Sequence, residues 1–469
     1  GPRAGTAIGP GGIGLGGGAS GSGTPLSSGG AVGSGGVASI GGMASSNSGS
    51  PGGSSAAGGS GGTRCHMWNV LWSWSVKVRV PVNDLMVWQR VNHFAEARQL
   101  TRKDLLKKHL AKYQVMHNTG RSAALFDRLT PTTFVLPKEA AAFEEAFVRA
   151  LHGVEPTCVQ PVGLNLWIQK PVGLSRGRGI SLISSFKKVN MAEAMVVQRY
   201  LTDPLLVEGY KFDLRLYVLV TSFNPLEAWM YEEGFARFTT FPYTLDEAEL
   251  GNMHVHLTNS SVQRTRAEGG QLPTFLQAAD PAGGSKTSLT TLRRLLSRHG
   301  VDWPLLWSRV CEVATAALFA AQDAIPHSPN SFELFGFDMM IDAELKVWLL
   351  EVNSSPSMGL DTPLDRAIKP RLIADVLELL APLPFDRTAL ASVLRARTNT
   401  SRSGRRGTHG LLSGTASEER EMCCADLQTV LGGALPRRYG EKPRSMGGFA
   451  CLAPSPFHDR LLKLRRPLP

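Results

Sequence analysis

Apolar positions in the central part of the chain recur with two periods, which predicts a mixed α/β fold. A period of two is typical of strands, and a period near 3.6 is typical of helices. The predicted strands span residues 71–80, 195–201, 211–222, 226–240, 332–342 and 345–353. The predicted helices span 85–100, 102–114, 289–300, 304–324 and 371–382. Residues 131–151 add a strand and a helix that begins at Pro137, and 165–184 add two apolar runs joined by a loop.

Two antiparallel hairpins are predicted among these strands. The first joins 211–222 to 226–240 through Asn224-Pro225, and the second joins 332–342 to 345–353 through a short turn. Residues 263–285 are polar and rich in glycine, which predicts a mobile loop between elements.

The two ends of the chain differ in composition from this central part. Residues 1–62 contain 25 of the 50 glycines and one charge, Arg3, so they cannot bury enough apolar surface to fold. Residues 386–469 contain 15 Lys+Arg against 7 Asp+Glu, a net charge of +8 within a total of +11. We therefore predict a disordered segment 1–62, a folded domain 63–385 (N-terminal part 63–160, second part 161–385) and a basic, disordered tail 386–469.

Composition also excludes several classes of protein. The chain has no run of about 18 apolar residues, so we predict no membrane span. Six scattered cysteines without a CxxC pair favour a reducing compartment over a disulfide framework or a zinc site. The chain does not begin with Met and shows no signal-peptide pattern, and we expect it to be a fragment.

Three predicted strands carry charged side chains on one face. In 211–216, Lys211, Asp213 and Arg215 point one way, while the apolar residues between them point the other way. Edge strands that present charges to water give the same pattern. Because three strands of one domain share this feature, we favour a buried charged face over three solvated edges.

Asp338 and Glu351 are candidate metal ligands on the second hairpin. The hairpin can place the two acids opposite each other, where they repel unless a cation lies between them. Asn353, on the same face as Glu351, adds an amide oxygen. Two carboxylates and an amide form an oxygen set that suits Mg²⁺ bound to nucleotide phosphates.

The loop 173–180 has the composition of a phosphate-binding segment. Its glycines permit a close approach of the backbone to phosphate, and Lys170, Arg176 and Arg178 add positive charge. It is neither a Walker loop nor a dinucleotide fingerprint, because no GKS or GKT follows and because it joins two strands. A surface lysine is the alternative for Lys170.

Seven motifs in this order resemble the tubulin tyrosine ligase-like family, with the polyglutamylase branch as the best match. They are WIQKPVGLSRGRGI, VVQRYL, GYKFDLRLYVLV, EGFARF, HLTNSSV, ELFGFDMMID and WLLEVNSSPSM, and they cover about residues 68–385. The resemblance implies an ATP-grasp fold, in which two α/β layers close over ATP behind a smaller N-terminal α/β domain.

The resemblance also implies roles for individual residues. The residues matching ATP-contacting positions are Lys170, Arg176, Gly177, Gln198, Arg199, Tyr200, Leu201, Lys211, Phe212, Asp213, Thr258 and Asn259. Those matching magnesium ligands are Asp338, Glu351 and Asn353. Those matching the site of the incoming amino acid are Arg237, Ser260, Ser261, Lys286 and Lys369, and Arg215 matches a phosphate-facing arginine. We count Arg215 and Arg237 as catalytic, and an ordinary exposed arginine is the alternative for Arg237.

The implied reaction is an ATP- and Mg²⁺-dependent ligation of free glutamate to glutamate side chains in the acidic tail of tubulin, through an acylphosphate. A glycine ligase of the same family and a non-catalytic microtubule-binding protein are the alternatives. The basic tail is a counterpart for an acidic filament, although a solvated tail or a nucleic-acid binder has the same charge. We predict a monomer in the cytoplasm and cytoskeleton, including cilium, flagellum or basal body, without membrane or nucleic-acid partners.

Overall fold

A computed structural model of the chain describes residues 66–74, 85–116, 126, 129–152, 164–172, 177–264, 272–279, 284–403 and 416–464. All of them belong to one unit, 59–469. The predicted disorder of residues 1–62 lies outside the described residues.

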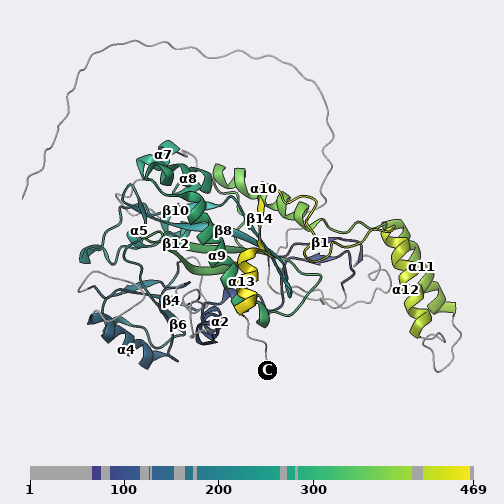
Figure 1. Cartoon of the computed structure of the whole chain (residues 1–469), viewed down its shortest axis with the longest axis horizontal. Coiled ribbons are helices and arrows are strands. Elements are labelled where there is room, and N and C mark those ends of the chain that lie inside the picture. Colours follow the sequence, from purple (N-terminus) through teal and green to yellow (C-terminus); the bar gives the residue numbers. More distant parts are fainter. Residues whose placement is uncertain are drawn as a thin grey trace, which may run out of the picture. The chain divides into compact units, whose positions relative to one another are not determined.

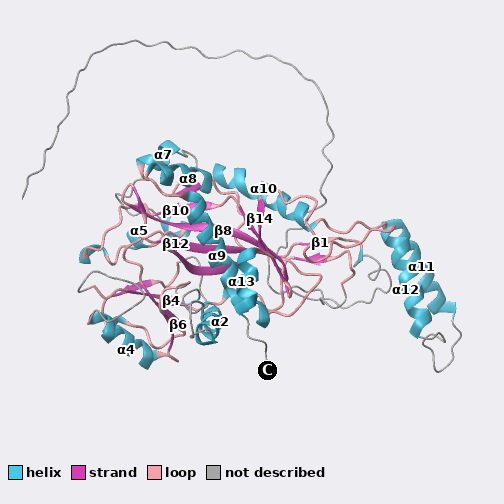
Figure 2. Cartoon of the chain, in the orientation of Figure 1, coloured by secondary structure: helices cyan, strands magenta, loops and turns pink. Residues whose placement is uncertain are grey.

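The larger sheet of the described residues is antiparallel and has eight strands (Figures 1 and 2). Its central order is β11-β10-β8-β12-β13, while β7 and β9 pair with β8, and β14 pairs with β9. These strands are β7 (Leu206–Val207), β8 (Tyr210–Phe223), β9 (Leu226–Tyr231), β10 (Phe235–Phe238), β11 (Lys286–Ser288), β12 (Glu333–Ile341), β13 (Val347–Ser354) and β14 (Phe449–Ala453). Both predicted hairpins are therefore confirmed.

The predicted strand 226–240 is wrong at one point, because residues 232–234 separate β9 from β10. Glu233 turns away and caps α8 (Leu289–Arg298), accepting a hydrogen bond from the Leu289 nitrogen at 2.7 Å. A Cβ on Gly234 would lie 2.5 Å from the backbone oxygen of Arg215, so this close approach requires glycine.

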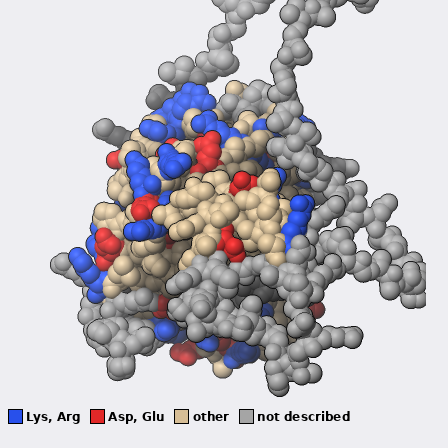
Figure 3. Space-filling model, turned by 90° about the vertical axis from the view of Figure 1, so that its right-hand side faces the viewer, with Lys and Arg blue, Asp and Glu red and all other residues tan. Residues whose placement is uncertain are grey.

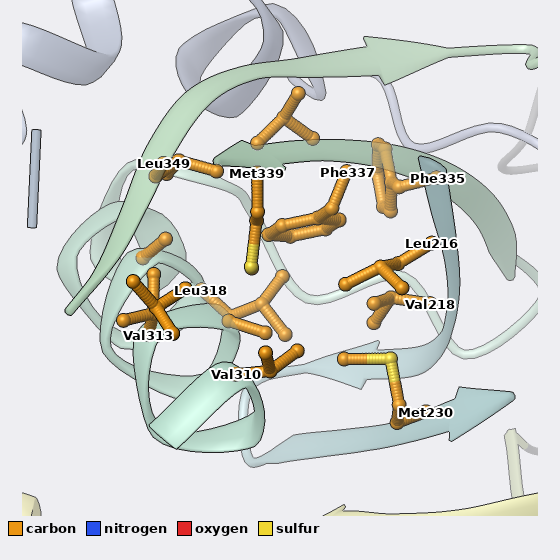
Figure 4. Packing of buried hydrophobic residues seen from close by; sticks show 14 of the residues in the cluster. Leu216, Val218, Met230, Val310, Val313, Leu318, Phe335, Phe337, Met339 and Leu349 are labelled. Atoms are coloured by element: carbon orange, nitrogen blue, oxygen red, sulfur yellow. The ribbon is translucent and has the colours of Figure 1, made fainter. Parts of the chain in front are cut away.

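Two layers of helices cover this sheet. On one face, α9 (Trp303–Ala321) and α8 pack against the apolar residues of β8, β12 and β13, and Figure 4 shows Val310, Val313 and Leu318 of α9 in this core. On the other face, α10 (Pro363–Leu380) packs against Tyr217 and Leu219. The alternation predicted for β8 is confirmed, since its even-numbered positions 212–220 belong to the α8–α9 core.

A smaller antiparallel sheet has the order β3-β6-β4-β5 and packs against α4. Its elements are β3 (Thr133–Leu136), α4 (Ala140–Leu151), β4 (Trp167–Pro171), β5 (Ser181–Ile183) and β6 (Met195–Arg199). Since β3 pairs with β6, the division that we predicted at residue 160 runs through one sheet and is wrong.

The helix predicted over 85–100 is also wrong. This stretch contains β2 (Arg90–Val91), which pairs with β1 (Val70–Leu71), and only its end is helical, in α1 (Arg98–Thr101). Buried polar contacts hold the extended segment, because His93 and the Phe94 nitrogen both bind the buried carboxylate of Glu333. The next predicted helix is confirmed as α2 (Lys103–Met116), and most of the predicted strand 71–80 lies outside the described residues.

Short helices complete the region around the sheets. They are the 3-10 turns at Phe186–Lys188, Glu247–Glu249 and Gln322–Ala324, and the helices α5 (Met253–His256), α6 (Ser260–Arg264) and α7 (Thr274–Ala279). Within the predicted loop 263–285, residues 263–264 form the end of α6 and residues 274–279 form α7.

The prediction of a disordered tail over 386–469 is wrong for its described residues. Helices α11 (Arg387–Ser403) and α12 (Ala416–Leu431) run side by side, β14 adds a strand to the larger sheet, and α13 (Pro456–Leu464) packs on α9 (Figure 1). Arg437 forms an ion pair with Glu227, whose side chain is 5% exposed. The net charge of the tail did not indicate this order, because each of these contacts depends on a few apolar or ion-paired residues.

One stretch of the described residues, Trp303–Ala324, is long and apolar enough to span a membrane, and 61% of the tested stretch is buried within the fold. Buried core helices meet the same criterion. On the face in Figure 3, acidic side chains lie among the basic ones. This agrees with a net charge of about +2 for residues 63–385, which remains when +8 for the tail and +1 for residues 1–62 are subtracted from +11.

Candidate active site

A cleft between the two sheets collects most of the predicted site residues. Its empty volume is about 650 Å³ including its open mouth. The predicted residues that line it are Lys170, Gln198, Arg199, Tyr200, Leu201, Lys211, Asp213, Arg237, Thr258, Asn259, Asp338 and Glu351. These residues come from β4, from β6 and the two residues after it, from β8, β10, β12 and β13, and from the segment after α5. The fold therefore assembles the site from seven separate parts of the chain.

The strand register aligns charged side chains across one face of the larger sheet. Arg237 on β10 lies opposite Lys286 on β11 and opposite Asp213 on β8. Asp338 on β12 lies opposite Arg215 on β8 and opposite Glu351 on β13. Positive and negative side chains thus form a row over five strands, and the apolar residues between them face the α8–α9 core.

Two arginines neutralise Asp338 within this row. Arg215 donates from Nε and Nη2 to the carboxylate of Asp338, at 2.5 and 3.0 Å. Arg237 lies 3.0 Å from the same carboxylate and also donates from Nε and Nη2 to Asp213, at 2.7 and 2.5 Å. Although burial opposes ionisation, the charges of the two arginines hold the pKa of Asp338 well below its usual range.

Arg237 is therefore not an ordinary exposed arginine, because its side chain is only 7% exposed. Its Nε–Nη2 edge binds Asp213 and is not open to an incoming carboxylate. Thr258 donates to the same Asp213 at 2.6 Å, which fixes the loop after α5 to the row.

A buried lysine, Lys211, and a half-buried lysine, Lys170, extend positive charge into the cleft. Lys170 donates from Nζ to Gln198 at 2.8 Å, and Lys211 donates to Tyr200 Oη at 2.7 Å. Burial lowers the pKa of Lys170 to about 8, aided by the charge of Lys103, and burial lowers the pKa of Lys211 to about 7. A buried anion would restore the full charge of both side chains, so the cleft favours an anionic ligand.

Asp338, Glu351 and Asn353 lie together as predicted. The Asn353 amide contacts Glu351 at 3.1 Å and Asp338 at 3.4 Å. Lys103 on α2 lies 2.9 Å from Glu351, so cations of the chain itself relieve the repulsion that we expected a metal to relieve. The three side chains still offer adjacent hard oxygen donors, and this set fits Mg²⁺ once the Asn353 amide turns its oxygen inward.

The lysines predicted to bind an amino acid meet at one carboxylate. Lys286 on β11 and Lys369 on α10 both lie 2.8 Å from Asp365, which is 1% exposed. Asp365 also belongs to the capping box of α10. Two cations share one anion here, which leaves this corner with one excess positive charge. Ser260 and Ser261, on α6, do not line the cleft.

Gly177 lies where the fold needs a glycine. Its φ is +74°, and an added Cβ would lie 2.8 Å from Val262 of α6, beside Asn259. Arg176 lies outside the described residues. The backbone at Gly177 thus approaches the segment Asn259–Val262, which contains the Asn of the Thr-Asn pair and the start of α6.

A family model described as the tubulin-tyrosine ligase family matches residues 82–390. The chain belongs to this family. Together with the two mixed α/β layers around the cleft, membership in the tubulin-tyrosine ligase family confirms the predicted ATP-grasp class.

Three relatives within the tubulin-tyrosine ligase family carry informative names. Tubulin polyglutamylase TTLL5 of Mus musculus is 36% identical over 340 residues, which are 70% of this chain and 24% of that protein. Probable tubulin polyglutamylase TTLL2 of Homo sapiens is 35% identical over 73% of this chain and 53% of that protein. Probable alpha-tubulin polyglutamylase Ttll1 of Tetrahymena thermophila is 32% identical over 77% of this chain and 90% of that protein. The predicted resemblance to the polyglutamylase branch is confirmed, and the chain spans from a quarter to about half of the first two relatives.

One predicted nucleotide contact is wrong. The side chain of Phe212 is 1% exposed and packs on Phe238 in the α8–α9 core, on the opposite face of β8 from Lys211 and Asp213. The period of two that predicted the charged face already assigns Phe212 to the other face.

Sequence reasoning missed the apolar walls of the cleft and two polar groups. The apolar walls are formed by Pro131, Ile168, Ile180, Leu257, Met340 and Leu350. His256 also lines the cleft, and Gln263 fixes the preceding loop by accepting from Thr240 and donating to the Leu257 oxygen. The HLTNSSV motif contains His256, so its position before the Thr-Asn pair was the available signal.

Proposed function

We propose that this chain is an ATP-dependent ligase that joins free glutamate to glutamate side chains in the acidic tail of tubulin. Membership in the tubulin-tyrosine ligase family and the polyglutamylase names of its relatives support the reaction class. The observation that carries the proposal is the row of paired charges beside Lys170 and Lys211, two lysines with lowered pKa values in one cleft.

ATP, as a substrate, fits the two kinds of wall in this cleft. Apolar side chains such as Ile168 and Met340 suit a purine, and the backbone of residues 198–201 passes beside them. Lys170 and Lys211 lie in the cleft, where bound phosphates would raise their lowered pKa values and keep both ammonium groups protonated. Thr258 and Asn259, of which Asn259 lies beside Gly177, complete the polar side.

Asp338, Glu351 and Asn353 would hold Mg²⁺. When bound, the ion would supply positive charge against the phosphate oxygens. Arg215 and Arg237 hold Asp338 in place and keep it ionised, so the oxygen donor is ready before any ligand arrives. Such preorganisation removes the cost of arranging charges during the reaction.

The reaction then takes two steps. A side-chain carboxylate of the protein substrate takes the γ-phosphoryl group of ATP, which forms an acylphosphate and releases ADP. The neutral amine of the incoming amino acid attacks the acyl carbon, phosphate leaves with the bonding electrons, and the amine gives up a proton as the amide forms. Holding all the reactants in one cleft lowers the barrier of both steps.

Glutamate is favoured over glycine by the surplus charge at the corner of Lys286 and Lys369. Glutamate brings two carboxylates and glycine brings one, so a glutamate site needs additional cations. Since Arg237 is committed to Asp213 and Asp338, these two lysines are the better candidates for that task. A glycine ligase remains the second candidate, because the same corner suits a single α-carboxylate.

A direct assay tests this proposal. The purified chain is given microtubules, ATP, Mg²⁺ and each of glutamate, glycine and tyrosine in labelled form, one at a time. We expect label on tubulin with glutamate alone, and none when ATP is omitted. Label from glycine alone would support the second candidate, and nucleotide binding without any label would support a non-catalytic protein. We also propose that the enzyme acts as a monomer and that it is located on the cytoskeleton.

A further inference from the structure

A line of hydrogen bonds leads from the cleft to the backbone of residues 247–249. Lys211 Nζ donates to Tyr200 Oη at 2.7 Å, and Tyr200 Oη lies 2.9 Å from His256 Nδ1. On the far side of the ring, His256 Nε2 lies 3.1 Å from the Glu249 carbonyl oxygen. All three side chains line the cleft and are 2–3% exposed.

The carbonyl of Glu249 fixes the direction of these bonds. A carbonyl only accepts, so His256 Nε2 carries a proton. Burial, with the charge of Lys211 nearby, lowers the pKa of His256 to about 4, so the ring is neutral and Nδ1 is an acceptor. Tyr200 donates its proton to Nδ1, which leaves the lone pairs of its oxygen for Lys211. Tyr243 also forms a hydrogen bond with Tyr200. Because the Tyr243 proton goes to the Thr202 carbonyl, the Tyr243 oxygen only accepts there, so His256 Nδ1 and Tyr243 Oη share the single Tyr200 proton.

We propose that His256 is a positioning residue that acts on Lys211 through Tyr200. By accepting the Tyr200 proton, His256 turns the oxygen lone pairs of Tyr200 toward Lys211 and fixes the direction of Nζ in the cleft. The remaining N–H groups of Nζ are then aimed before a phosphate arrives. This inference rests on the proposed function, since it assumes a nucleotide as the ligand.

Two substitutions separate this role from a purely structural one. His256→Asn keeps an acceptor near the position of Nδ1 and loses the contact to Glu249. His256→Gln keeps a donor near the position of Nε2 and loses the acceptor for Tyr200. We expect the Asn variant to keep the affinity for nucleotide within about threefold and the Gln variant to lose on the order of tenfold, because the Gln variant lacks the acceptor that orients Tyr200 toward the ammonium of Lys211.

A double-mutant cycle tests the path through Tyr200. Affinity for a fluorescent ATP analogue is measured for the wild type, Tyr200→Phe, His256→Leu and the double variant, and the melting temperature of each is recorded. We expect each single variant to lose on the order of tenfold, and the double variant to lose no more than either one. His254→Asn, on the same helix and outside the cleft lining, is the control with unchanged affinity.

The outcomes distinguish the inference from the proposed function. If the wild type does not bind the analogue, the proposed function fails. If it binds and the losses of the single variants multiply in the double variant, His256 acts independently of Tyr200 and the inference is overturned. Equal affinity of the Asn and Gln variants, or affinity losses that merely follow the melting temperatures, would also overturn it.

Discussion

Arg237 on β10 lies directly opposite Asp213 on β8 and binds both oxygens of its carboxylate, at 2.7 and 2.5 Å. The same guanidinium reaches Asp338 on β12 at 3.0 Å. One side chain therefore links three strands of the larger sheet and compensates two buried acids. This arrangement makes Arg237 part of the framework on which the cleft is built.

Replacing Arg237 by alanine would leave Asp213 and Asp338 with less compensation in a buried site. We expect Arg237→Ala to lower the free energy of unfolding by about 3–5 kcal/mol, as when one partner of a buried ion pair is removed. Arg298→Ala, at an exposed position on α8, should change it by less than about 0.5 kcal/mol. Urea unfolding of both variants measures the difference, and equal small effects would contradict the role given to Arg237.

The lowered pKa of Lys211 predicts how nucleotide binding depends on pH. Only the protonated ammonium attracts phosphate, so affinity for ATP should fall as the pH rises through about 7. Lys211→Arg keeps a charge that does not titrate in this range and should flatten the dependence. Equilibrium binding of ATP between pH 6 and pH 9 checks both statements. A wild-type affinity that is constant over this range would refute the assignment.

Arg437 is expected to stabilise the fold although it lies beyond the part matched by the family model. It binds the buried Glu227, so Arg437→Ala should lower the free energy of unfolding by about 3–5 kcal/mol. Its neighbour Arg438 is exposed, and Arg438→Ala should change it by less than about 0.5 kcal/mol. Thermal unfolding of the two variants decides the point, and matching melting curves would contradict it.

The pair formed by His93 and Glu333 predicts a second dependence on pH. Burial opposes the charge, but hydrogen bonding to Glu333 raises the pKa of His93 above 6.5. Its contribution to stability is complete below about pH 6.5 and is lost as the pH rises through the raised value. The difference in unfolding free energy between wild type and His93→Gln should therefore shrink from pH 6 to pH 8.5. A difference that grows with pH would reverse the assigned sign.

The sequence predicted the charged face of β8 and the opposition of Asp338 and Glu351, because both follow from local strand periodicity. Pairings between distant positions have no such signal. Glu227 meets Arg437 and Lys286 meets Asp365 only after the chain folds, so neither partner could be assigned. The helix predicted over residues 85–100 is wrong because short apolar runs fit both periods, and the buried contacts of His93 favour the extended backbone.

The ligation assay with Glu351→Gln tests the central claim most directly. The substitution keeps the volume of the side chain and removes one charge from the proposed magnesium set. Tubulin, ATP, labelled glutamate and increasing Mg²⁺ are given to the wild type, to Glu351→Gln and to Glu344→Gln, an exposed site on the same hairpin. The account predicts labelled tubulin with the wild type and the Glu344 variant, and none with a folded Glu351 variant. Ligation by the Glu351 variant with an unchanged dependence on Mg²⁺ would contradict it.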